Sequence, residues 1–346
     1  MKEINRWQGN LAPIVAAISL ACAYTGSAEA SADKPVVALS NSYYGNTWRH
    51  QMVQSFSDAA SEAKKNGQIS DFIILNGDGS ASQQNSQIAE LILKKVDVIA
   101  VDAASESALN GVIEKACKAG IKVLSFDATA SASCDTRLEF DFSGYKKVQT
   151  QKVLDKIGNK GNLLIVRGVK GNTPDHLMYD AQQEVIKQHP DVKVVGVVYG
   201  QATASVAQSA IANVLPSLPH VDAVIGQGGN DDIGIVQAFE QFGGPYKQKM
   251  PIIEGGGSAN FIHWWAQQNK ATGYSTISMN VTPGIGGAAF WVAYNLARGN
   301  PVPRQMTMPV ATVTDQTVGQ YTSLPDGAII SPTYSEEWVK DNLLKK

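Results

Sequence analysis

The chain carries few of the residue patterns that enzymes use for chemistry. Gly255-Gly256-Gly257 follows an apolar run, but the dinucleotide-binding spacing G-x-G-x-x-G fails because Asn260 stands at the third glycine position. Neither a phosphate-binding G-x-x-x-x-G-K-[ST] motif nor a G-x-S-x-G turn occurs. The five histidines lack metal-ligand spacing, and Cys117 and Cys134 do not form C-x-x-C. The sequence predicts no metal, no cofactor and no enzymatic activity.

The segments that would position functional groups alternate along the chain between expected strands and expected helices. Short runs of Val, Ile and Leu are typical of parallel strands buried on both faces, and Trp48, Met52 and Phe56 have the spacing of one helix face. This α/β alternation predicts doubly wound parallel sheets, and nine strands predict two domains rather than one. The expected strands are Val36–Ser40, Phe72–Asn76, Val98–Val101, Val123–Phe126, Leu163–Arg167, Val192–Tyr199, Ala223–Gly226, Ile252–Glu254 and Gly273–Ile277.

Polar and aromatic residues follow the expected strands at their carboxyl ends, where open parallel sheets bind ligands. Carboxylates and amides can hold a hydroxyl group in two directions, and aromatic faces can cover the C–H face of a sugar ring. We therefore predict a site for a small polyhydroxy compound. Its candidate residues are Tyr44, Asn46, Trp48, Asp102, Asp127, Asn172, His176, Asn230 and Asn280.

Several of these candidates have a structural alternative. Asp127 could cap a helix instead of binding ligand, and Asn230 could do both. Trp48 lies on the apolar face of its helix, so core packing competes with ring stacking, and Tyr44 could take over the stacking role.

The first thirty residues have the order of a signal peptide. Lys2 and Arg6 form a basic start, an apolar stretch runs over 11–24, and Ala28-Glu29-Ala30 has a cleavable small-x-small form. We expect export to the periplasm with cleavage near Ala30. A buried N-terminal helix is the alternative, which Pro13 disfavours. In an oxidising compartment Cys117 and Cys134 could pair, because a helix end and the loop after the next strand can approach, or they could remain free thiols.

Composition excludes several classes of protein. The hydrophobic content of 44% and charged content of 17% exclude a disordered chain. A net charge of −2 with scattered Lys and Arg predicts no nucleic-acid partner.

Four motifs resemble the ribose-binding-like periplasmic sugar-binding proteins of ABC transporters, the type I proteins that share a fold with the lactose repressor. These motifs are Val36–Ser40 followed by Asn46 and Trp48, Val98–Asp102, Ala119–Asp127, and Ala223–Ile225 with Asn230-Asp231. The resemblance implies two doubly wound domains joined by a three-crossing hinge. It implies a first lobe of 34–142 with 279–310 and a second of 143–278 with 311–346. It also implies ligand roles for Asn46, Trp48, Asp102, Asp127, Asp141 and Asn230.

The chain departs from that family pattern at three places. Ala128 replaces the arginine that often follows the fourth-strand aspartate, His176-Leu177-Met178 replaces an arginine-bearing segment, and Gly255–Gly257 replaces a strand end such as Phe-Asp. Because pockets built for specific hydroxyls reject other ligands, we expect a ligand other than ribose.

These features together predict an exported, monomeric solute-binding protein that delivers a sugar or polyol to the membrane permease of an ABC importer. The alternatives are a periplasmic sugar sensor that presents its ligand to a chemoreceptor or sensor kinase, and an exported α/β enzyme. A transcription regulator is set aside, because the strands begin at Val36 without a preceding helix-turn-helix.

Overall fold

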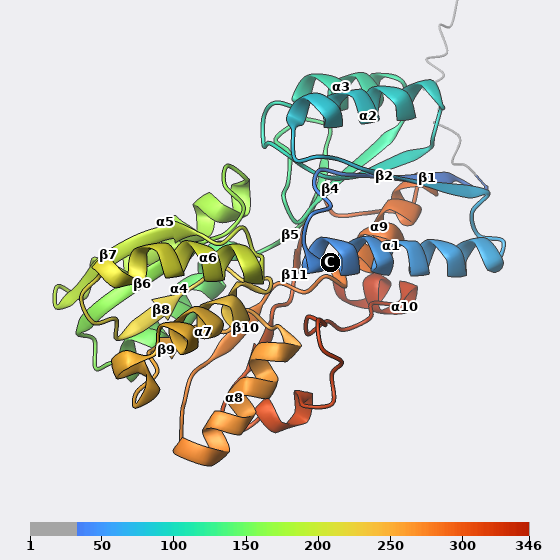
Figure 1. Ribbon diagram of the computed structural model, residues 1–346. Helices are drawn as coiled ribbons and strands as arrows, with labels where there is room; N and C mark the ends of the chain where they lie inside the picture. The colour runs from blue at the N-terminus through green and yellow to red at the C-terminus, as the bar shows by residue number, and fades with distance from the viewer. Residues whose placement is uncertain (1–32, 346) are drawn as a thin grey trace, which may run out of the picture. The chain divides into compact units, whose positions relative to one another are not determined.

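The computed structural model describes residues 33–345, and the predicted signal peptide lies outside them (Figure 1). The first sheet has six parallel strands, and its central strands are apolar runs of five or six residues that are buried on both faces. Across the sheet the strands are β2 (Asp71–Asn76), β1 (Val36–Asn41), β3 (Val98–Asp102), β4 (Lys122–Phe126), β5 (Thr136–Phe140) and β11 (Gln305–Met308).

Helices cover both faces of this sheet. Successive strand residues point to opposite faces, so Val37 and Leu39 pack on one side and Ala38 on the other. The first side is covered by α1 (Thr47–Lys65) and α9 (Ile285–Ala297), which pack on each other. The second side is covered by α2 (Ala81–Leu93) and α3 (Asn110–Lys118).

The second sheet has four parallel strands in the order β7 (Val192–Tyr199), β6 (Gly161–Arg167), β8 (Ala223–Ile225) and β9 (Ile252–Ile253). Leu163 and Ile165 face one core while Leu164 and Val166 face another. The covering helices are α4 (Phe142–Lys156) and α5 (Thr173–Ile186) on the first side, and α6 (Ala204–Val214), α7 (Asp231–Phe242) and α8 (Ala259–Thr272) on the second.

The predicted fold class is confirmed, with two parallel sheets wound on both faces. The chain passes between the sheets from β5 to α4, and again through the antiparallel pair β10 (Ser278–Asn280) and β12 (Ala311–Val313). The predicted strand Gly273–Ile277 is wrong, because β10 begins at Ser278. Prediction also missed β5, β11 and β12, whose short runs mix polar and apolar residues.

The C-terminal segment contacts elements of both sheet layers. Within 311–346, assigned to the second lobe, α10 (Glu336–Val339) packs on α9 of the first. Ile330 N donates to Gly257 O over 2.9 Å, whereas Ile329 N donates to Gln51 Oε1 of α1 over 3.1 Å. This stretch is therefore a further connection between the two sheet layers.

Among the described residues, helices long and apolar enough to span a membrane are absent. Cys117, the penultimate residue of α3, and Cys134, in the loop after β4, form a disulfide with an S–S distance of 2.07 Å. The loop that it closes has a sequence separation of 17 and contains β4.

Replacing both cysteines by serine should lower the free energy of unfolding by about 2–4 kcal/mol, because a loop of this length gains chain entropy when the crosslink is lost. Urea unfolding of the double variant, compared with the oxidised parent, measures the difference. The reduced parent serves as the control and should match the variant. A loss below about 1 kcal/mol would contradict a stabilising crosslink.

Candidate ligand-binding site

A cavity of about 70 Å³ lies where the carboxyl ends of strands from both sheets meet. The loop after β1 contributes Asn46, and β4 is followed by Asp127. From the second sheet, β6 is followed by Gly168 and β8 by Gln227. Its lining is Asn46, Trp48, Arg49, Asp127, Phe142, Gly168, Val169, Asn172, Pro174, Asp175, Met178, Ala202, Gln227, Gly228, Gly229 and Val281.

Arg49 is the charged centre of the first-lobe wall. Its guanidinium is buried and forms an ion pair with Asp102 at the end of β3, and Nη2 lies 3.5 Å from Asp127 Oδ2. Burial lowers the pKa of Arg49, and the Asp127 charge opposes that effect. Burial also raises the pKa of Asp127, with Arg49 acting in the opposite direction. The pair therefore places a desolvated carboxyl group beside a cation at the cavity wall.

The backbone of Asp127 has φ of 57°, in the left-handed region. Asp and Asn tolerate this region better than other residues with a side chain. Asp127 N donates to Leu138 O over 3.0 Å, which anchors the turn on β5. At Asp127 the backbone turns sharply and leaves the direction of β4. This turn explains why the Asp127 carboxylate faces the cavity.

Asn46 and Trp48 place the start of α1 against the cavity. Asn46 Oδ1 accepts a hydrogen bond from Arg49 N over 2.8 Å, so the residue caps the helix while lining the cavity. Trp48 Nε1 donates to Val281 O over 2.9 Å, and its side chain is 7% exposed. Trp48 is thus both a core residue and part of the wall.

The opposite wall comes from the loop after β6, from α5 and from the loop after β8, and Arg167 at the end of β6 lies next to it. Arg167 binds Asp175 through two hydrogen bonds, Nε to Oδ1 over 2.9 Å and Nη2 to Oδ2 over 2.7 Å. The guanidinium also lies over the rings of Tyr179 and Tyr199, at 4.1 and 5.0 Å from their centroids. Gln227 Oε1 accepts from Gly168 N, and its Nε2 donates to Asp175 O.

These groups suit a neutral ligand with several hydroxyls. Arg49 faces two carboxylates and Arg167 is matched by Asp175, so the lining has no surplus positive charge for an anion. Carboxylate and amide oxygens can accept hydroxyl hydrogen bonds. The apolar side chains of Phe142, Pro174 and Met178 can cover C–H groups.

Four predicted site residues line this cavity, namely Asn46, Trp48, Asp127 and Asn172. Asn172 caps α5 by accepting from Asp175 N over 2.9 Å.

Four other predicted residues lie outside the lining. Tyr44 is 42% exposed and its ring contacts His50. Asp102 is fully buried, and its carboxylate forms an ion pair with Arg49. Asp141 caps α4 by accepting from Gly144 N over 2.8 Å. His176 is exposed on α5.

Asn230 and Asn280 also lie outside the lining, and each bonds to another segment of the protein. Asn230 Nδ2 donates to Thr47 Oγ1 over 3.3 Å, which joins the starts of α7 and α1. Asn280 Nδ2 donates to Ile330 O over 2.9 Å in the C-terminal connection. Both side chains therefore join segments that are distant in the sequence.

Sequence reasoning missed Arg49, Asp175 and Gln227 as lining residues. Asp175 and Gln227 lie within the polar stretches that follow strands, but nothing in the sequence ranks them above their neighbours. Arg49 gave no signal, because a helical arginine is ordinarily exposed.

Larger clefts lie elsewhere. One of about 600 Å³ is lined by Met250, Trp264 and Tyr274, and another of about 310 Å³ lies between α1, α9 and Tyr334. The first lies at the amino ends of the second sheet, opposite the edge where parallel sheets bind ligands. The smaller cavity is the better candidate because buried polar groups from several strand ends converge on it.

Comparison with known proteins agrees with this architecture. Residues 37–301 match the family described as periplasmic binding protein domain. An ABC transporter solute-binding protein from Thermobispora bispora has a TM-score of 0.83 and 34% identity, with 90% of this chain and 95% of that one covered.

Two curated relatives are named for their ligands. The multiple sugar-binding periplasmic receptor of Rhizobium radiobacter is 28% identical over 52% of this chain and 56% of its own. The xylitol-binding protein of Mycolicibacterium smegmatis is 26% identical over 51% of each chain. The chain thus spans about half the length of these curated relatives. The match over 37–301 and the likeness to the Thermobispora bispora structure establish that this chain belongs to the periplasmic binding protein family.

Proposed function

We propose that this chain is an exported solute-binding protein that captures a neutral sugar or polyol in the cavity and delivers it to the permease of an ABC importer. The observation that carries the proposal is the buried Asp127–Arg49 pair, set opposite the apolar side chains of Phe142 and Met178. A carboxylate in such a site accepts two hydroxyl hydrogen bonds, which water does not screen.

The proposal includes movement of the two lobes, with the boundaries expected above and the C-terminal connection as an added link. A volume of about 70 Å³ is small for a monosaccharide, since ligand pockets ordinarily exceed about 300 Å³. Uptake would require the walls to separate and then close on the ligand, so that ligand binding favours the closed population. The protein performs no chemistry on its ligand.

The remaining features of the proposal concern the whole protein. One relative is named as a multiple sugar-binding receptor and another as a xylitol-binding protein, which supports a sugar or polyol as the ligand. Cleavage near Ala30 would release a periplasmic protein, which acts as a monomer and meets a membrane permease.

A thermal-shift screen of pentoses, hexoses, polyols and nucleosides should identify the ligand. A compound that binds only the folded protein stabilises it by mass action and therefore raises Tm. At a ligand concentration of about a hundred times Kd, the free energy of unfolding rises by about 2.7 kcal/mol. Sugar acids with the same carbon skeletons are the control and should give smaller shifts. Stabilisation by the acids but not by the neutral compounds would contradict the proposed ligand class.

Asp127→Asn should weaken binding of the identified ligand about 10- to 150-fold, because a hydrogen bond to a charged group contributes about 1.5–3 kcal/mol. Asparagine tolerates the left-handed backbone, so the fold should persist. Isothermal titration calorimetry measures the loss. The matched control is Asp141→Asn, which keeps a helix cap outside the cavity and should leave affinity within about twofold. Equal losses in both variants would place the ligand elsewhere.

A further inference from the structure

The glycine triplet after β9 lies directly behind the cavity wall. A Cβ on Gly256 would lie 2.7 Å from Gly228 Cα and 3.3 Å from Gly229 O, a separation that only glycine allows. Gly228 and Gly229 line the cavity, whereas Gly256 is outside the lining. Gly228 therefore borders both Gly256 and the cavity, and Gly256 packs against the loop of Gln227–Gly229.

The first two residues of α7 hold these two loops in place. Asp231 Oδ2 accepts hydrogen bonds from Gln227 N over 3.1 Å and from Gly228 N over 3.2 Å. Asp232 Oδ2 accepts from Gly256 N over 2.8 Å and from Ser258 N over 3.3 Å. Both carboxyl groups are buried. One helix start thus fixes the cavity-lining loop and the loop that supports it.

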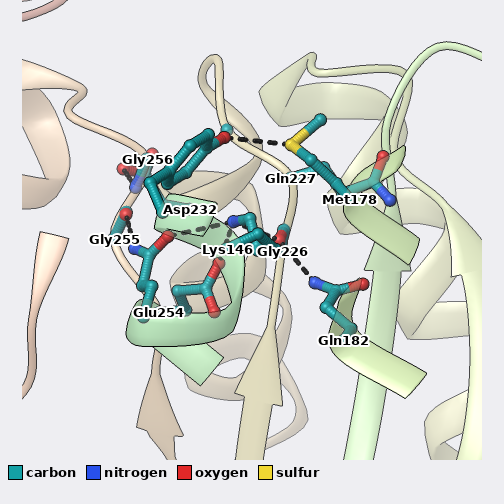
Figure 2. Close-up of polar contacts among 12 residues, drawn as sticks. Lys146, Met178, Gln182, Gly226, Gln227, Asp232, Glu254, Gly255 and Gly256 are labelled. Atoms are coloured by element: carbon teal, nitrogen blue, oxygen red, sulfur yellow. Dashed lines mark hydrogen bonds and ion pairs between the residues drawn. The ribbon is translucent and has the colours of Figure 1, made fainter. Parts of the chain in front are cut away.

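A buried lysine ties the same loops from the other face of the sheet (Figure 2). Lys146 Nζ on α4 donates to Gly226 O over 3.0 Å and to Glu254 Oε1 over 2.5 Å. Gln182 Nε2 on α5 also donates to Gly226 O. On α4, Gln149 Nε2 donates to Gly255 O. The backbone on both sides of the Gly228–Gly256 contact is therefore hydrogen-bonded to buried side chains.

We propose that Gly256 and Asp231 are positioning residues of the binding site, which set the depth of the cavity through Gly228 and thereby the size of the ligand. The inference rests on the proposed function, since it concerns the same cavity. An added methyl group at Gly256 would push Gly228 into the cavity, because buried backbone behind the contact cannot yield. Loss of the Asp231 acceptor would free the two amides that hold the lining loop.

Asparagine is the conservative replacement for Asp231, because the surroundings of this carboxyl group favour its uncharged form. Burial and then the neighbouring Asp232 raise the pKa of Asp231 to about 8, which favours the uncharged form of this carboxyl group. The charged or titratable groups around it are Asp232 on α7, Lys146 and Tyr145 on α4, and Glu254 after β9. Asp231→Asn keeps an acceptor oxygen without a charge, whereas Asp231→Ala removes the acceptor.

The first test uses the ligand-free protein. Amide hydrogen exchange at Gln227 and Gly228 should be at least about tenfold faster in Asp231→Ala and in Gly256→Ala than in the parent, since the hydrogen bonds that protect these amides are lost or distorted. Asp231→Asn should restore slow exchange. The matched glycine control is Gly111→Ala in α3, where an added Cβ meets nothing within 4 Å. Unchanged exchange in both Asp231→Ala and Gly256→Ala would overturn the inference.

The second test uses two sugar pairs that differ by one hydroxymethyl group, D-xylose with D-glucose and D-ribose with D-allose. For a pair that binds the parent, Gly256→Ala should weaken the larger sugar about tenfold more than the smaller, because the narrowed cavity clashes with the added group. Equal weakening of both sugars would overturn size control by Gly256. If the parent binds none of the four sugars, the proposed function loses support, and the exchange measurement alone decides the inference.

Discussion

The buried guanidinium of Arg49 is the interaction on which the candidate site depends. A charge out of water is costly unless it is paired, and here two carboxylates supply the pairing. Asp102 and Asp127 can do so only because β3 and β4 are parallel neighbours, whose carboxyl ends lie side by side. The ion cluster therefore joins three elements, α1, β3 and β4, and leaves Asp127 as the carboxyl group that faces the cavity.

The second lobe also contains buried ionisable side chains, but their arrangement differs from that around Arg49. Glu254 forms an ion pair with the ammonium group of Lys146, and the charges of Lys146, Asp232 and Glu254 all act on Asp231; the four side chains are buried. Burial raises the pKa of each carboxyl group, and hydrogen bonds from backbone amides oppose this effect at Asp232. Backbone amides of the two loops donate hydrogen bonds to Asp231 and Asp232. This arrangement makes the loops after β8 and β9 one hydrogen-bonded unit.

The C-terminal connection links the two sheet layers through one side chain of α1 and the loop before α8. The Gln51 side chain both donates to Gly327 O and accepts from Ile329 N, so one amide on α1 holds two residues of the passing chain. Ile330 N binds the backbone of Gly257 at the same place. Because these bonds tie α1 to the loop before α8, separation of the cavity walls would have to break them or carry the segment along with one lobe.

Much of the architecture followed from the sequence, because near-continuous apolar runs such as Val98–Val101 are compatible only with burial on both strand faces. The strand-end rule then placed Asn46 and Asp127 at the edge where the cavity lies. Strands β5 and β11 escaped prediction, since Thr136–Phe140 and Gln305–Met308 mix polar and apolar residues and form strands by pairing with distant segments of the chain. Only the tertiary structure decided that Arg49 is buried and that Asn230 bonds to Thr47. Both depend on which distant segments meet, and no local pattern encodes that meeting.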